Sequence, residues 1–188
     1  MLRDYTPLPF ALLQPGAPYA QPTQSVPERV SLNDPAQQVM TDFRSVTAVI
    51  ILSGDTVEEA HRRMIQRGVR LLLVVDQDRR VVGVVTATDI LGEKPMQVTS
   101  QRGIRREELL VRDIMTGQEV LEVLSMSDVR TAKVGHVVAT LRRSGRHHAI
   151  AVETDSRGRQ TVRGAGGAGA RECGGAGEWR GSAVRQHS

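Results

Sequence analysis

The run GVVTATD at residues 83–89 carries the residue types in this chain best suited to binding a ligand. Its glycine allows a close approach of the backbone. If a strand ends near Thr86, the hydroxyls of Thr86 and Thr88 meet the start of the next helix, where free N–H groups and the helix dipole favour anions. Asp89 then offers a carboxylate to two neighbouring hydroxyls, as in a sugar diol. Taken alone, the run favours a simpler interpretation, in which a threonine caps the helix and Asp89 is its first-turn acid.

Cationic or titratable residues precede two other predicted strands. Arg70 stands before the apolar run 71–75, and Arg146, His147 and His148 stand before 149–153. Three such residues in a row are costly ahead of a buried strand unless they meet solvent or an anion. An anion site is therefore favoured for the second group. For Arg70, a surface charge at a strand edge is an equal alternative.

The chain shows no pattern typical of catalysis or metal binding. His61 and His136 stand alone on predicted helices, without Cys or carboxylate at ligand spacing. Cys173, the single cysteine, lies in a Gly-rich tail and suggests neither a nucleophile–base pair nor a disulfide. No Gly-Lys-Ser/Thr follows a strand, so a P-loop is absent. We expect no metal site, and these residues suggest no catalytic constellation.

Composition narrows the class further. The 188 residues are 39% hydrophobic and 3% aromatic, with a net charge of +4, and the arginines alternate with acids. Interleaved acids and few stacking aromatics argue against nucleic-acid binding. No apolar run is long enough to span a bilayer, and prolines interrupt the N-terminal apolar residues where a secretory signal would need continuity. We expect a soluble cytoplasmic protein with no membrane or nucleic-acid partner.

An internal repeat organises the chain. Residues 57–76 align without gaps on 134–153, an offset of 77 residues. The periodicity predicts a strand, a helix ended by Gly, two further strands and a short helix in each copy. In copy one these fall at 46–52, 57–67, 69–75, 81–86 and from Thr88; in copy two the helix is expected at 133–143 and the next strand at 149–153. The fold class is α/β (α+β), with two small repeats packed about a pseudo-twofold axis.

These patterns divide the chain into five segments. Residues 1–38 hold seven of the eight prolines and are expected to form a disordered arm. Repeat one follows at 39–92, a linker with the helix-like RGIRREELLVRDIM at 93–112, and repeat two at 113–164. The last segment, 165–188, is a Gly/Ala-rich tail that is expected to be disordered. The openings VMTD (39–42) and DIMT (113–116) echo one another.

The second repeat breaks off at Gly164. Residues 165–188 contain seven Gly and five Ala, a composition that cannot bury a helix face. The tail is either a natural flexible end or the product of a frameshift near codon 164; we favour the frameshift, because the break falls within a predicted strand. The other two reading frames of the DNA distinguish the two. In either case repeat two lacks its hydroxyl, its acid and its closing helix, which would leave apolar surface and a strand edge open.

The openings VMTDF and DIMTG, the sequence GVRLLLVVD followed by GVVTATDILG, and the duplication itself resemble the cystathionine β-synthase (CBS) domain pair, or Bateman module, over residues 39–164. The resemblance implies a regulatory module, not an enzyme, that binds an adenine nucleotide (AMP, ADP or ATP) or S-adenosylmethionine in clefts between the repeats. It also implies a homodimer that signals to a regulated protein partner not identified by the sequence. A dimerisation or docking scaffold without nucleotide binding, with the proline-rich arm recruiting a partner, is the alternative.

The resemblance also implies roles for individual residues. Asp89 is expected on the ribose and Thr86 near the phosphate, with Arg70, His147 and His148 facing the phosphates across the central cleft. The small residues Thr47 and Ala48 are expected to line the adenine pocket. The full set of expected ligand-binding residues is Thr47, Ala48, Arg70, Gly83, Thr86, Thr88, Asp89, His147 and His148.

Overall fold

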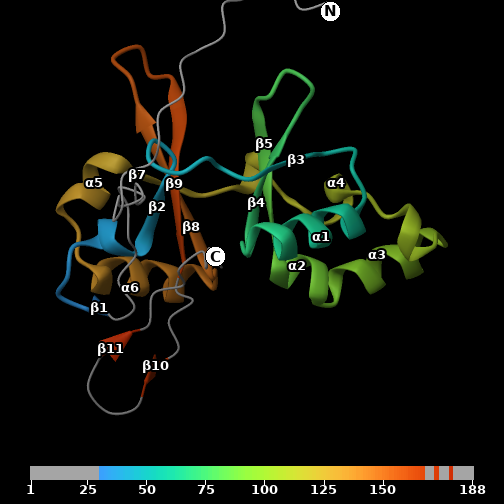
Figure 1. Ribbon diagram of the computed structural model, residues 1–188, viewed down its shortest axis with the longest axis horizontal. Coiled ribbons are helices and arrows are strands. Elements are labelled where there is room, and N and C mark those ends of the chain that lie inside the picture. The colour runs from blue at the N-terminus through green and yellow to red at the C-terminus, as the bar shows by residue number, and fades with distance from the viewer. Residues whose placement is uncertain (1–29, 168–171, 174–177, 180–188) are drawn as a thin grey trace, which may run out of the picture.

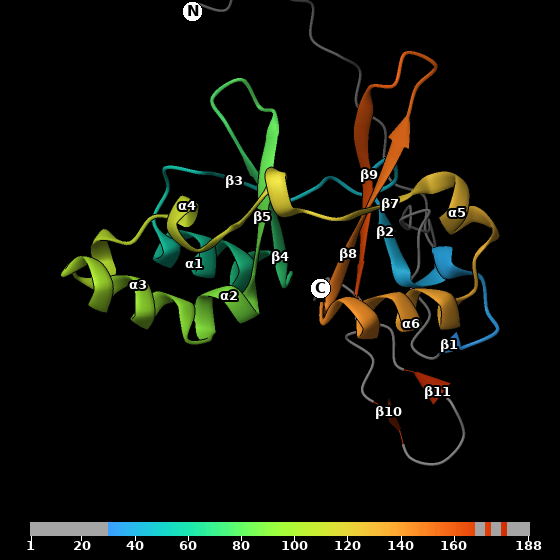
Figure 2. The ribbon, with the colours of Figure 1, turned by 180° about the vertical axis from the view of Figure 1, so that it is seen from behind.

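The computed structural model describes residues 30–167, 172–173 and 178–179, which form two lobes side by side (Figures 1 and 2). The first lobe contains β3 (Ile50–Leu52), α1 (Val57–Arg67), β4 (Leu71–Val75), β5 (Val81–Thr86), α2 (Ala87–Leu91), α3 (Lys94–Arg102), the 3₁₀ turn η2 (Arg106–Glu108), α4 (Val111–Ile114) and β6 (Thr116–Gly117). The second contains β1 (Val30–Ser31), the 3₁₀ turn η1 (Ala36–Val39), β2 (Met40–Asp42), β7 (Val123–Ser125), α5 (Met126–Thr131), α6 (Val134–Ser144), β8 (His148–Thr154) and β9 (Gln160–Gly167). A third 3₁₀ turn, η3 (Gln118–Val120), lies between the lobes in sequence, and β10 (Glu172–Cys173) and β11 (Glu178–Trp179) form a small sheet with β1. The arrangement confirms the predicted mixed α/β class.

The repeated helices begin and end as the sequence pattern predicts. In α1, Thr56 Oγ1 accepts a hydrogen bond from Glu59 N at 3.2 Å, and Gly68 ends the helix with φ 61°. In α6, Gly145 ends the helix with φ 65°. Both terminal glycines adopt the left-handed conformation that costs other residues most.

Two predicted elements are placed differently. The strand expected at 46–52 is reduced to β3, because Val46 N donates to Asp42 O in a turn at 2.9 Å. The linker helix lies at α3, ahead of RGIRREELLVRDIM, and Gly103 (φ 64°) ends it. The helix-like run itself forms only η2 and α4.

Each lobe holds a four-stranded sheet, and the two sheets exchange a strand. The first has the order β3-β4-β5-β6 and the second β2-β9-β8-β7. In each, the first strand of the repeat pairs in parallel with the next strand, and the remaining pairs are antiparallel. Strand β2 lies at the start of repeat one in the chain but completes the sheet of repeat two. Strand β6 lies at the start of repeat two but completes the sheet of repeat one. The echoing openings therefore correspond to each other, and each supplies a strand to the other repeat's sheet.

Part of the segment expected to be a disordered arm is ordered. Val30 and Ala36 are buried, and Ala36 N donates to Ala132 O at 2.9 Å. Its counterpart in the first lobe is Val111 N, which donates to Asp55 O at 2.9 Å. The prediction of disorder was wrong for residues 30–38, because this segment packs on α6 as α4 packs on α1. Residues 1–29 lie outside the described part of the chain.

The two sheets face each other across one apolar core. Leu73 and Val84 from the first sheet pack with Ile150 and Val152 from the second. A separate core lies under the helices of the first lobe and is centred on Ile51, Leu72 and Val85. Leu71 and Thr86 form a strand pair at the end of the inter-lobe face, and His148 and Gly167 occupy the corresponding places in the second sheet.

Strand β9 does not stop at Gly164. It continues to Gly167 and is paired on one side with β8 and on the other with β2. The predicted disorder was therefore wrong for residues 165–167, and the expected open edge at this strand is covered by β2. Gly164, where the repeat breaks off in sequence, lies within this strand, as expected. The rest of the tail, including the place of a closing helix, lies outside the described residues except for β10 and β11.

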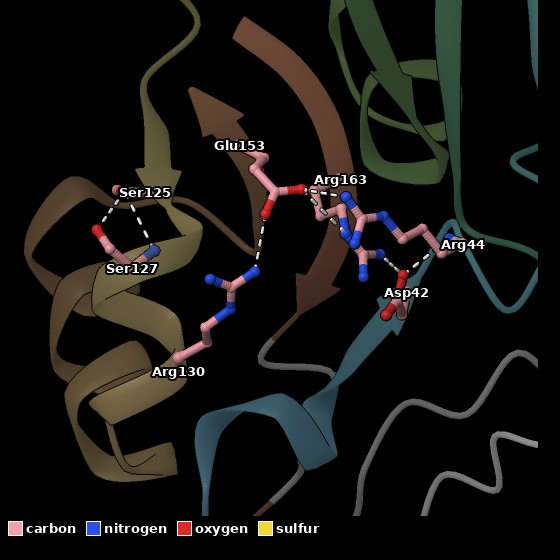
Figure 3. Close-up of polar contacts among 7 residues, drawn as sticks. All are labelled: Asp42, Arg44, Ser125, Ser127, Arg130, Glu153 and Arg163. Atoms are coloured by element: carbon pink, nitrogen blue, oxygen red, sulfur yellow. Dashed lines mark hydrogen bonds and ion pairs between the residues drawn. The ribbon is translucent and has the colours of Figure 1, made fainter. Parts of the chain in front are cut away.

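A network of ion pairs connects strands β2, β8 and β9 of the second sheet (Figure 3). Arg163 on β9 contacts Asp42 on β2, and its Nε lies 3.6 Å from Glu153 Oε2 on β8. Glu153 is also paired with Arg44 at 2.6 Å and with Arg130 of α5 at 2.8 Å. The network thus links the exchanged strand β2 to the sheet that it completes.

Candidate functional site

The predicted ligand residues Thr86 and Asp89 are joined to each other at the start of α2. Thr86 Oγ1 accepts from Asp89 N at 3.2 Å, and Asp89 Oδ2 accepts from Thr86 N at 2.9 Å and from Thr86 Oγ1 at 2.6 Å. This reciprocal capping box is the structural role that the sequence left open for both residues. These bonds also restrict the rotation of the Asp89 carboxylate.

A residue that sequence reasoning missed occupies the other carboxylate oxygen. Lys94 Nζ lies 2.5 Å from Asp89 Oδ1 and 3.3 Å from the backbone oxygen of Ile114. A carboxylate offers about four lone-pair sites, and three donors already bind this one. Asp89 can therefore accept one ligand hydroxyl as it stands, and two only if Lys94 moves away. The signal available in the sequence was a lysine in a chain that has only two, five residues after the acid.

Arg70 lies against the same helix start. Its backbone oxygen accepts a hydrogen bond from Ala87 N, the first residue of α2, at 2.9 Å. The residue is exposed, and within the described residues its guanidinium has no ion-pair partner. The side chain is therefore free to meet an anion at this end of the sheet.

The second lobe contributes His148 to the same place. Burial lowers the pKa of His148, as do the nearby charges of His147 and Arg70, while Asp89 acts in the opposite direction. Arg70 and Asp89 belong to the first lobe, so these interactions bring residues of both repeats together. His147 is exposed beside it. The structure thus gathers Arg70, Thr86, Asp89, His147 and His148 at one end of the inter-lobe face.

The remaining predicted ligand residues have weaker positions. Thr47 is exposed in the loop before β3, Ala48 packs on the inter-lobe core, and Thr88 is exposed on α2. Gly83 is buried within β5, where an alanine Cβ would lie 2.5 Å from Thr116 O of β6. The structure thus assigns Gly83 to strand packing rather than to the cleft.

The corresponding half-site of the second repeat is built differently. Gly167 pairs with His148 as Thr86 pairs with Leu71, so the position of the capping hydroxyl carries no side chain. A Cβ there would lie 2.9 Å from His148 Cδ2. Arg146, expected to face an anion, instead donates to Val120 O at 2.8 Å and lies 3.4 Å from Glu122 Oε2. Sequence reasoning was right that this half-site is incomplete, and wrong about what Arg146 contacts.

Neither a metal site nor a membrane span is found in the described part of the chain. There, no group of three or more His, Cys, Asp or Glu residues could hold a metal ion. No helix there is long and apolar enough to cross a membrane.

Comparison with known proteins supports the resemblance to CBS domains. The model of the CBS domain matches residues 36–95, which include η1, β2 and the elements of the first lobe up to the start of α3. The resemblance seen in the sequence is therefore confirmed, and the match to the family model lies in the first repeat.

Individual relatives are distant. The uncharacterized protein MJ1225 of Methanocaldococcus jannaschii is 28% identical over 108 residues, covering 49% of this chain and 38% of that protein. The chain therefore spans less than half the length of this curated relative. An uncharacterized conserved protein of Pyrococcus horikoshii shares the fold at 21% identity and a TM-score of 0.50, over 72% of this chain and 87% of the other. The CBSX2 protein of Arabidopsis thaliana, solved in complex with AMP, is 17% identical with a TM-score of 0.47, over 70% of this chain and 88% of that one.

Proposed function

We propose that this protein is a regulatory CBS module that binds an adenine nucleotide between its two repeats. The observation that carries the proposal is the meeting of Arg70, Thr86 and Asp89 of the first lobe with His148 of the second. A rigid carboxylate suits a ribose hydroxyl, and a free guanidinium beside a helix start suits a phosphate. Adenine is assigned by the family's general ligand class and by the small residue Ala48, which lies at the edge of the inter-lobe core.

The mechanism is a shift in packing. A ligand that contacts both lobes favours the arrangement in which Arg70 and His148 converge, and it can bias the equilibrium only by its difference in affinity for the two arrangements. Because the lobes share one apolar core, a change at the cleft alters how the sheets pack. A protein partner, or the second subunit of a homodimer, would respond to that packing. This role is regulatory rather than catalytic.

Asp89→Asn tests the site directly. Calorimetric titration of the wild-type chain with AMP, ADP, ATP and S-adenosylmethionine should show binding of at least one ligand. The asparagine loses a charge-assisted hydrogen bond, so affinity should fall roughly ten- to hundredfold. Absence of heat with all four ligands, or unchanged affinity in Asp89→Asn, contradicts the proposal.

The chain offers a matched control at Asp113. Its Oδ2 accepts from Leu110 N at 2.9 Å at the start of α4, and its Oδ1 lies 2.5 Å from Arg102 Nη1. This is the same position in a helix, with the same backbone bond and a cation at the same distance as at Asp89. Asp113→Asn should therefore lower the stability of the fold as Asp89→Asn does, because both remove the same helix-start bond, while leaving ligand affinity unchanged.

A dimerisation or docking scaffold is the second candidate. Ile65, Leu91 and Met96 on the consecutive helices α1, α2 and α3 are 68%, 63% and 67% exposed, and a partner that covered these helices would bury them. Gly167 also leaves the second half-site without its hydroxyl. This candidate predicts a stable dimer by light scattering and no change in melting temperature with any of the four ligands.

A further inference from the structure

The carboxylate at the proposed site already has its own counter-ion. Lys94 Nζ lies 2.5 Å from Asp89 Oδ1, and the two side chains are 49% and 12% exposed. The positive charge of Lys94 therefore compensates the negative charge of Asp89, and the lysine side chain is more exposed to solvent than the aspartate. A positively charged ligand entering here finds no unpaired negative charge on this carboxylate.

The other charges around this carboxylate are positive or can become positive. Arg70 is exposed without an ion-pair partner among the described residues, and His147 and His148 stand at the start of β8. Glu93, next to Lys94, lies along α3, where its Oε2 accepts from Gln97 Nε2 at 3.5 Å. The cleft thus presents one compensated acid, one free guanidinium and two imidazoles.

We propose that the site selects phosphate-bearing adenosine ligands over S-adenosylmethionine, and that Lys94 sets this preference. The inference rests on the proposed function and narrows its ligand class. S-adenosylmethionine carries a sulfonium, an ammonium and one carboxylate, so its net charge is positive, whereas AMP carries a doubly charged phosphate near neutral pH. Burial, followed by the charges of His147 and Arg70, lowers the pKa of His148, and a bound phosphate would favour the protonated imidazole.

Coulomb's law sets the scale of the preference. One interaction between two unit charges about 7 Å apart changes the affinity for a ligand about tenfold, if the effective dielectric constant lies between that of a protein surface and that of water. AMP should therefore bind at least about tenfold more tightly than adenosine, and adenosine more tightly than S-adenosylmethionine. The advantage of AMP should shrink as salt is raised, because exposed charges are screened within about 10 Å at 0.1 M ionic strength.

Calorimetry with AMP, adenosine and S-adenosylmethionine at one pH and two salt concentrations tests the order on the wild-type chain. Tightest binding of AMP, weakened by salt, supports the inference. Binding of S-adenosylmethionine as tight as that of AMP overturns it and leaves the proposed function intact. Absence of binding by all three overturns the inference and the proposed function together.

Lys94→Met tests the role of the lysine, since it keeps the aliphatic stem and removes the ammonium. With Asp89 uncompensated, the ratio of AMP affinity to S-adenosylmethionine affinity should fall about tenfold. Lys133→Met is the matched control, because Lys133 is the chain's other lysine and lies at the start of α6 in the second lobe. An unchanged ratio in Lys94→Met, or an equal fall in Lys133→Met, refutes the assignment to Lys94. The salt dependence of the wild-type chain provides evidence even if the variant folds poorly.

Discussion

Replacing Gly83 by alanine tests the strand exchange that completes the first sheet. The added Cβ would lie 2.5 Å from Thr116 O and 3.2 Å from Gly117 Cα, both in β6. Real Cβ contacts are rarely shorter than 3.0–3.4 Å, so β6 would have to retreat by about 0.5–0.9 Å. A backbone atom in a paired strand cannot rotate away as a flexible side chain can, so the strain falls on the β5–β6 ladder.

The expected cost follows from that geometry. Overpacking of this kind costs about 1–3 kcal/mol, and weakening one backbone hydrogen bond adds about 1 kcal/mol. Gly83→Ala should therefore lower the free energy of unfolding by about 2–4 kcal/mol, which for a chain of this size lowers the melting temperature by roughly 4–16 °C. Thermal and urea unfolding followed by circular dichroism measure both quantities.

Gly54→Ala serves as the control for Gly83→Ala. A Cβ at Gly54 meets nothing within 4 Å, and its φ lies outside the positive range, so the substitution should be neutral or stabilise by up to about 1 kcal/mol. Gly164, where a Cβ would lie 2.6 Å from Thr41 O of β2, should behave like Gly83. Equal stability of Gly83→Ala and Gly54→Ala would refute the close approach of β6, and with it the exchanged topology.

Three further predictions concern the dimer, the cleft and the charged network. Leu91→Glu should dissociate the proposed homodimer, as measured by light scattering. Val120→Glu, which changes another exposed apolar residue outside α1–α3, should leave the dimer intact. The reverse result would place the interface elsewhere. Because the pKa of His148 is lowered in the fold, the folded state binds fewer protons than the unfolded state. The free energy of unfolding should therefore fall as the pH drops below about 6.5. This fall per pH unit should be smaller in His148→Gln than in the control His61→Gln. Arg163→Met should cost about 1–3 kcal/mol in urea unfolding, because it leaves Asp42 and Glu153 partly buried with fewer cations. Arg159→Met at the exposed pair with Asp155 should cost clearly less, because solvent screens that pair. Equal costs would mean that the network adds nothing to stability.

The sequence by itself determined the repeat, the main helices and strands of each copy, and the pair Thr86 and Asp89 at the candidate site. Helix ends at Gly68 and Gly145 and the apolar run 71–75 follow from local periodicity and from the conformational freedom of glycine, so they could be predicted without the fold. The pairing of Thr86 with Asp89 could be predicted as well, because a capping box needs only a spacing of three residues.

The tertiary structure alone decided which distant segments meet. Strand β2 is only three residues long and carries no signal that its partner is β9, more than a hundred residues later; that choice depends on the apolar core between the lobes and on the contact of Arg163 with Asp42. For the same reason the sequence could not show that Lys94 pairs with Asp89 or that His148 of the second lobe lies near Arg70 of the first. Such pairings depend on how two helices and two sheets pack, and residue spacing along the chain does not encode that packing.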